Sequence, residues 1–239
     1  MFRKFLEAGG RGDEWFENDR PCEVKTHPFG SDEFWESKLR MFGFGELFLD
    51  KSFDQIAAKH PQHKNTLWSY LQEIDRYVSG DHKGIGVVLT GPVGTLKTTM
   101  LWLFAKMIVL RYAKLRKPHP MIKYVKYHEV AKRLSQERFS NYGGPGYANS
   151  LSNVDVLMID DFAPFGIMQH ESEELFEIFD ARWSEKRITF VATNQDEEWL
   201  QANLPQVKDR WNTSLLLRFD GASERKMSAE VSERLGMND

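Results

Sequence analysis

Residues 91–98 have the sequence Gly91-Pro92-Val93-Gly94-Thr95-Leu96-Lys97-Thr98, and this stretch indicates the fold. An apolar run from Ile85 to Thr90 precedes it, and a helical pattern from Thr98 to Tyr112 follows. A glycine-rich loop between a buried strand and a helix N-terminus can curl its N–H groups around a phosphate, while a lysine reaches the terminal phosphates and a hydroxyl binds Mg²⁺. We therefore predict a phosphate-binding loop in which Lys97 contacts phosphate and Thr98 the metal. The alternative is a glycine turn that precedes a helix by chance.

The expected cofactors of this loop are ATP or ADP and Mg²⁺. The predicted nucleotide contacts are the eight loop residues and the next position along the helix: Gly91, Pro92, Val93, Gly94, Thr95, Leu96, Lys97, Thr98 and Thr99. Leu96 departs from the pattern, since glycine is used where a side chain would crowd the ligand or where φ is positive. We expect the loop to keep its shape if φ of Leu96 is negative and the side chain points away. ATP binding is thus predicted, with hydrolysis slow or stimulated by a partner.

A second apolar run, Val154 to Ile159, stops at two carboxylates, Asp160 and Asp161. In open α/β sheets ligands gather beyond the carboxyl ends of the strands. We predict that Asp160 holds Mg²⁺, directly or through water, and that Asp161 acts as general base toward the attacking water. The alternative is a solvated turn, and the phosphate-binding loop upstream favours the nucleotide site.

A third apolar run, Ile188 to Thr193, ends at Asn194. The amide of Asn194 is placed to orient water near a γ-phosphate, although asparagine is also a common turn residue. Further along, Arg210 and Arg225 are candidates to stabilise charge on a transferring phosphoryl group, from the same subunit or from a neighbour. An arginine taken alone is more commonly a surface residue, so only the whole array supports these two roles.

The apolar patterns alternate between strands and helices, which predicts a parallel sheet between helical layers. The remaining predicted elements are a helix from Asn65 to Val78, a strand from Met121 to Tyr127, a helix from Glu129 to Phe139, a loop from Asn141 to Asn149, a helix from Glu171 to Trp183 and a strand from Leu215 to Phe219. Residues 61–239 form the predicted nucleotide-binding core. Residues 1–60 form a short N-terminal appendage, whose aromatics Phe34, Trp35, Phe42, Phe44 and Phe48 either pack on the core, the favoured interpretation, or dock a partner.

Composition excludes several classes of protein. A chain of 239 residues with 41% hydrophobic residues can bury one sizeable core. A formal net charge of -3 argues against a polycation that coats nucleic acid, and the single Cys22 excludes an intramolecular disulfide. The apolar stretch Met100 to Leu110 is too short to cross a bilayer, and we expect a cytoplasmic protein without membrane contact. Basic and aromatic residues interleave from Lys123 to Tyr127, but strand alternation divides them between two faces, which favours a plain sheet strand over a DNA-binding face.

Taken together, the array resembles the DnaC/DnaI-type helicase loaders and the related IstB-type transposition ATPases, both in the AAA+ superfamily. The resemblance covers about residues 45 to 226, and it rests on the loop, the acidic pair, the end of the third strand and the Asp209-Arg210 segment. By this resemblance Asp160 is similar to the Walker B metal residue, and Asn194 to the sensor of the middle strand. Arg210 resembles an arginine finger donated to the next subunit, and Arg225 a second sensor for the nucleotide of its own subunit.

The resemblance implies an AAA+ P-loop NTPase fold, a ring or spiral oligomer, and a replicative DNA helicase and single-stranded DNA as partners. Three functions stay open at this point: a loader that delivers the helicase to single-stranded DNA, a transposition ATPase that binds double-stranded DNA, and a nucleotide-dependent binding module with little turnover. A small-molecule kinase is a weaker fourth, since its phosphate loop would not explain Asn194 together with Arg210.

Overall fold

A five-stranded parallel sheet forms the centre of the computed structural model, which describes residues 32–45, 48, 51, 56, 58–79, 86–115, 117–138, 146–163, 169–211 and 214–221. The strands lie in the order β2-β3-β4-β1-β5 and are β1 (Val87–Thr90), β2 (Ile122–Lys126), β3 (Val156–Phe162), β4 (Ile188–Thr193) and β5 (Leu215–Arg218). Because every pair is parallel, the carboxyl ends of all five strands lie at one edge of the sheet.

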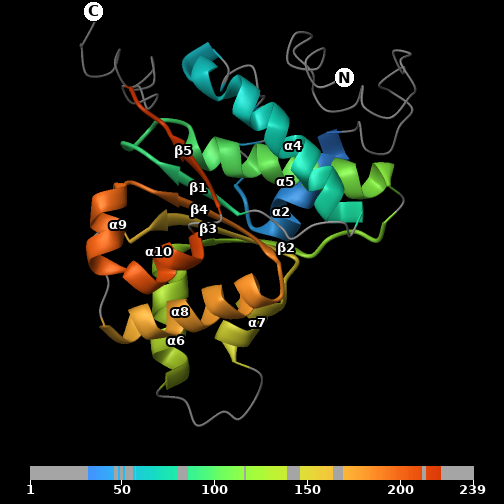
Figure 1. Cartoon of the computed structure of the whole chain (residues 1–239). Coiled ribbons are helices and arrows are strands. Elements are labelled where there is room, and N and C mark those ends of the chain that lie inside the picture. Colours follow the sequence, from blue (N-terminus) through green and yellow to red (C-terminus); the bar gives the residue numbers. More distant parts are fainter. Residues whose placement is uncertain are drawn as a thin grey trace, which may run out of the picture.

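Helices cover both faces of the sheet (Figure 1). One face carries α2 (Asp32–Phe42), α4 (Lys64–Ser79) and α5 (Lys97–Lys114), and a short 3-10 turn, η3 (Pro61–His63), leads into α4. The other face carries α6 (Tyr127–Arg138), α7 (Tyr147–Asn153), α8 (Gln169–Ser184), α9 (Glu197–Asn203) and α10 (Pro205–Trp211). The predicted parallel sheet between helical layers is confirmed. None of the helices in the described part of the chain has both the length and the apolar composition that a membrane span needs.

Two hydrophobic clusters, one on each face, hold the helices to the sheet. Strand residues alternate between them: Val87 and Leu89 of β1 point to the face of α5, and Val88 points to the face of α8. This burial on both faces explains why the strands appear in the sequence as continuous apolar runs. On β2, Tyr124 lies in the α5 cluster and Val125 in the α8 cluster, as the alternation predicted.

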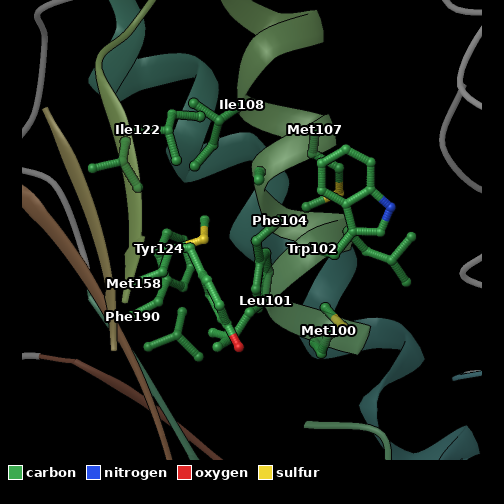
Figure 2. Close-up of a cluster of buried hydrophobic side chains, with 14 of the residues drawn as sticks. Met100, Leu101, Trp102, Phe104, Met107, Ile108, Ile122, Tyr124, Met158 and Phe190 are labelled. Carbon is green, nitrogen blue, oxygen red and sulfur yellow. The ribbon is translucent and has the colours of Figure 1, made fainter. Parts of the chain in front are cut away.

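Helix α5 is the best-buried helix on its face. Its side chains from Met100 to Leu110 are nearly all inaccessible to solvent, and Phe104 stacks on Phe190 of β4 with ring centroids 4.7 Å apart. Figure 2 shows this layer between the helix and the strands. The segment before the core packs on the same helix, because Trp35 of α2 lies edge-on against Trp102 at 6.0 Å. Trp35, Phe42 and Phe44 are buried here, and Phe34 and Phe48 are partly buried against the cluster, so the packing interpretation of these aromatics is confirmed.

The helix α8 face contains a buried arginine that joins three elements. Arg182 is 1% exposed, and its guanidinium donates hydrogen bonds to the Thr189 hydroxyl and to the carbonyl oxygens of five residues: Leu151, Ser152, Val154, Asp155 and Ile188. Burial lowers the pKa of Arg182 to about 9. The side chain thereby satisfies carbonyls at the end of α7 and at the starts of β3 and β4.

Several predicted boundaries differ from the structure by a few residues. Helix α4 starts at Lys64, directly after η3, one residue before the predicted start at Asn65. The expected loop from Asn141 to Asn149 ends early, because α7 starts at Tyr147 with Gly146 as its extended N-cap; residues 141–145 lie outside the described residues. Strand β3 continues through Asp160 and Asp161 to Phe162, because its pairing with β4 resumes after the acidic pair.

Candidate nucleotide-binding site

The loop between β1 and α5 curls around the ammonium group of Lys97. The Nζ atom of Lys97 donates hydrogen bonds of 2.6 Å to the carbonyl oxygens of Gly91 and Pro92, and Thr95 Oγ1 donates to the Pro92 carbonyl at 2.8 Å. Lys97 is 8% exposed although it carries a charge. A lysine at a helix N-terminus within a glycine-containing loop is the residue that reaches the phosphates in a phosphate-binding loop.

Leu96 adopts a left-handed backbone conformation, with φ 71° and ψ 15°. The condition of a negative φ is therefore not met: the loop keeps a conformation that glycine adopts easily, with a leucine at this position. The condition on the side chain is met, since Leu96 is half-buried against the hydrophobic cluster of α5. Because the side chain packs inward, it leaves the concave side of the loop to the backbone N–H groups.

The loop depends on glycine at position 91, where the chain turns closely past the end of β5. Gly91 has φ 139°, and a Cβ atom placed there would lie 2.0 Å from the carbonyl oxygen of Phe219. Phe219 in turn donates its N–H to the Thr90 carbonyl at 2.7 Å. The start of the loop and the end of β5 are thus fixed against each other with no room for a side chain.

Two buried histidines at η3 hold neighbouring elements: His60 contacts the loop and His63 contacts the end of β5. His60 Nε2 lies 3.1 Å from the Thr95 carbonyl oxygen and His63 Nε2 lies 2.6 Å from the Arg218 carbonyl oxygen. These distances require that each Nε2 carries a hydrogen and donates it. His60 Nδ1 is buried and has no hydrogen-bond partner among the described residues, and burial lowers the pKa of His60. The segment that precedes α4 therefore contributes directly to the shape of the loop.

The first acidic residue meets the helix N-terminus as predicted. Thr98 Oγ1 donates a hydrogen bond of 2.8 Å to Asp160 Oδ2, across 62 positions of sequence. Asp160 is 3% exposed, and this burial raises its pKa, while hydrogen bonds from the hydroxyls of Tyr124 and Thr98 oppose the rise. A hydroxyl and a carboxylate oxygen side by side are ligands that suit Mg²⁺.

The second acidic residue points away from the first because the strand is irregular at this point. The register between β3 and β4 shifts between Ile159 and Phe162, and Asp161 has φ 49°. The N–H of Asp161 turns back to Asp160 Oδ1 at 3.0 Å, and its side chain is exposed. A bulge that re-aims one side chain is common beside functional sites. Asp160 is therefore buried next to the loop, and Asp161 faces solvent.

Asn194 lies exposed directly after β4, and its neighbours attach the strand end to β3. Thr193 Oγ1 donates to the Phe162 carbonyl at 2.8 Å, and Gln195 Nε2 donates to the Ala163 carbonyl at 2.8 Å. The carboxyl ends of β3 and β4 are thus held side by side, and Asn194 sits at the edge of the sheet that bears the loop.

Arg210 lies on the opposite helical layer and contacts α8. Its Nε donates to Asp180 Oδ1 at 2.7 Å, and its guanidinium lies 4.9 Å from the ring centroid of Trp183. Nη1 also donates to Asp209 of its own helix at 2.9 Å. Within this chain the structure therefore brings Lys97, Thr98 and Asp160 together but places Arg210 with α8. Arg225 lies outside the described residues.

The chain was compared with protein families, curated proteins and solved structures. No family model matches the chain. The chain is 28% identical over 193 residues to the replicative helicase loader DnaC of Buchnera aphidicola subsp. Baizongia pistaciae (strain Bp), which covers 77% of this chain and 73% of that protein. This similarity extends over most of the fold. In sequence the chain is thus similar to a DnaC-type helicase loader.

Two solved structures share the fold of this chain. Domain III of the Thermotoga maritima replication initiation protein DnaA has a TM-score of 0.53 at 15% identity, over 66% of this chain and 62% of that one. The AMPPCP-bound DnaA of Aquifex aeolicus has a TM-score of 0.52 at 15% identity, over 72% of this chain and 55% of that one.

Sequence reasoning missed two kinds of residue at this site. Tyr124 donates its hydroxyl to Asp160 Oδ2 at 2.8 Å, and the histidines described above contact the loop and the end of β5. Alternation alone placed Tyr124 on the face opposite Val125, but only the pairing of Lys126 with Asp160 brings the tyrosine next to the carboxylate. The strand register, which the sequence does not state, was the missing signal.

Proposed function

We propose that this AAA+ protein binds ATP and ADP with Mg²⁺ at the loop 91–98 and hydrolyses ATP slowly or under the control of a partner. The observation that carries the proposal is the hydrogen bond between the Thr98 hydroxyl and the buried Asp160 carboxylate, next to the buried ammonium of Lys97. The left-handed conformation of Leu96 supports it further, because the backbone there keeps the course that a glycine would give it.

The residues present suit Mg²⁺ bound together with nucleotide. Within the described ranges no group of three or more His, Cys, Asp or Glu side chains gathers around one point. Mg²⁺ is usually held by one or two carboxylates, with phosphate oxygens and water completing the shell. Thr98 and Asp160 would hold the ion, which when bound would neutralise charge on the phosphates.

Each predicted site residue then has a role. The N–H groups from Gly91 to Thr99 and the ammonium of Lys97 would bind the phosphates. Asp161 would accept a proton from the attacking water, which Asn194 would help to orient. Arg210 would reach the nucleotide of a neighbouring subunit in a ring or spiral, and Arg225 the nucleotide of its own subunit.

We further propose that the protein loads a replicative DNA helicase onto single-stranded DNA during DNA replication. The support is the 28% identity to a protein named as a replicative helicase loader, over most of both chains. Leu96 bears on this role, because a strained loop suits an ATPase whose turnover depends on a partner. The partner is a hexameric helicase in this proposal, and the self-assembly of the loader is a ring or spiral.

Calorimetry of the full chain with ADP or ATP and Mg²⁺ tests nucleotide binding. Lys97→Ala should abolish binding, whereas Lys117→Ala, which removes an exposed lysine, should leave it unchanged. No heat of binding by the unmodified chain, or equal binding by both variants, would refute the nucleotide site.

Turnover separates an ATPase from a binding module. Phosphate release should rise when helicase and single-stranded DNA are added, and Asp161→Asn should suppress it while Glu185→Gln should not. Turnover that is absent under every condition would favour the binding module.

Mass determination of the full chain, with and without nucleotide, tests the partner. A hexameric helicase should be retained in the presence of ATP, and a transposase with double-stranded DNA should not. Retention of the transposase alone would favour the transposition ATPase and contradict the loader.

A further inference from the structure

Tyr124 completes the hydrogen bonding of the carboxylate that the proposed function assigns to Mg²⁺. Its hydroxyl donates to Asp160 Oδ2 at 2.8 Å, the same oxygen that accepts the Thr98 hydroxyl at 2.8 Å. Asp160 Oδ1 accepts the N–H of Asp161 at 3.0 Å. Both oxygens are therefore held by donors from β2, β3 and α5, which fixes the plane of the carboxylate.

The tyrosine is placed for this contact by the sheet. Tyr124 is 8% exposed, and its strand pairs with β3 so that Lys126 lies opposite Asp160. Figure 2 shows the Tyr124 ring between the strands and α5, with its hydroxyl directed toward the end of the helix where Met100 lies. The buried hydroxyl of Tyr124 therefore acts as a hydrogen-bond donor to the Asp160 carboxylate.

Phe44, which precedes the predicted core, packs against the ring of Tyr124. Phe44 stacks on Tyr124 with centroids 4.0 Å apart and planes inclined by 26°. Gly43, with φ 94°, turns so close to β2 that a Cβ atom there would lie 2.9 Å from the Tyr124 carbonyl oxygen. The N–H of Phe44 bonds to the Leu39 carbonyl at 2.9 Å, so the turn after α2 holds the phenyl ring in place.

The N-terminal segment, defined here as residues 32–44, is anchored independently of the tyrosine. Trp35, Leu39 and Phe42 are 3%, 0% and 1% exposed and belong to the same cluster as Trp102 of α5. A packed segment of this kind transmits a displacement to the ring it touches, because close-packed interiors deform little.

We propose that Tyr124 is a positioning residue for Asp160 and that Phe44 couples the N-terminal segment to the magnesium site. The inference rests on the proposed function, because it assumes that Asp160 binds Mg²⁺ with nucleotide. Coupling between two sites is reciprocal, so a displacement of the N-terminal segment weakens Mg²⁺-nucleotide binding, and that binding stabilises the segment by the same factor.

The test compares ADP affinity with Mg²⁺ and with EDTA, by calorimetry on the full chain. Tyr124→Phe removes the hydroxyl and keeps the ring, whereas Phe44→Leu keeps an apolar side chain and removes the stack. Tyr112→Phe is the matched control, because it removes a tyrosine hydroxyl from α5, away from Asp160. Loss of an outer-shell partner costs about 10- to 100-fold in metal affinity. We expect Tyr124→Phe to weaken the Mg²⁺-dependent binding by about tenfold, Phe44→Leu by less, and the double variant no more than Tyr124→Phe, with EDTA values unchanged.

Hydrogen exchange of the unmodified chain supplies a readout independent of any variant. Mg²⁺ with ADP should slow exchange at the amides of Gly43 and Phe44, and Tyr124→Phe should remove this protection. A chain that binds no nucleotide refutes the proposed function and this inference with it. A chain that binds, with Mg²⁺ dependence in Tyr124→Phe within about twofold of normal or with unchanged exchange at residues 43–44, overturns the inference alone.

Discussion

Replacement of Leu96 by glycine and by alanine isolates the cost of the strained loop. Both changes remove the half-buried leucine side chain and its contact with the α5 cluster. Only glycine also removes the conflict between a Cβ atom and φ 71°. The difference in unfolding free energy between Leu96→Gly and Leu96→Ala therefore measures backbone strain, with the lost packing common to both.

The magnitude follows from two opposing effects. The left-handed conformation costs a residue with a Cβ atom roughly 1–2 kcal/mol. Glycine also lowers the stability of the folded chain by about 0.4–1 kcal/mol relative to alanine, because it gives the unfolded chain more conformational freedom. We therefore expect Leu96→Gly to be more stable than Leu96→Ala by about 0.5–1 kcal/mol, or about 2–3 °C in a domain of this size.

Urea unfolding followed by circular dichroism measures both variants, with the slopes checked for equality. A control pair at Leu115, where φ is -86° and the side chain is 37% exposed, should give the opposite order, with alanine the more stable. Leu96→Ala as stable as Leu96→Gly, or more so, would refute the strained conformation. Nucleotide affinity should be the same in both, because the backbone course of the loop does not change.

Three further outcomes are expected. Gly91→Ala should destabilise the chain by more than about 2 kcal/mol, because its Cβ atom would meet the Phe219 carbonyl, and thermal unfolding at normal temperature would contradict the contact. Arg182→Met should cost about 3 kcal/mol or more in urea unfolding, because it leaves buried carbonyls without donors, and an effect below about 1 kcal/mol would contradict that role. Burial lowers the pKa of His60 below 6.5, so the unfolded chain binds more protons and stability should fall as pH drops through 6.5. His60→Gln keeps a donor for the Thr95 carbonyl and should flatten this pH dependence. An unchanged pH profile of stability would exclude His60 as its source.

The sequence predicted the elements that local patterns determine. A parallel strand buried on both faces must be a continuous apolar run, and the runs before Gly91, before Asp160 and before Asn194 all became strands of one sheet. Parallel strands share a carboxyl edge, so the loop and Asp160 were expected together, and the contact between Thr98 and Asp160 joins them.

The remaining features depend on contacts between distant segments. The φ of Leu96 follows from the course of the whole loop, and the isolated residue favours the opposite sign. The role of Tyr124 depends on strand register, and the ion pair of Arg210 with Asp180 depends on how α10 crosses α8. None of these features produces a residue pattern at a fixed spacing in the sequence.

The pairing of β1 has a consequence for synthesis of the chain. Its partners are β4, where Phe190 lies opposite Val87, and β5, where Leu215 lies opposite Val87, and both are synthesised about a hundred residues or more after Val87. Contacts between such distant segments form slowly. The turn at Gly91 also needs Phe219 beside it. A nascent chain that stops short of residue 219 therefore carries the complete loop sequence without the strand end that shapes it, and the loop reaches its final conformation only after Phe219 has emerged.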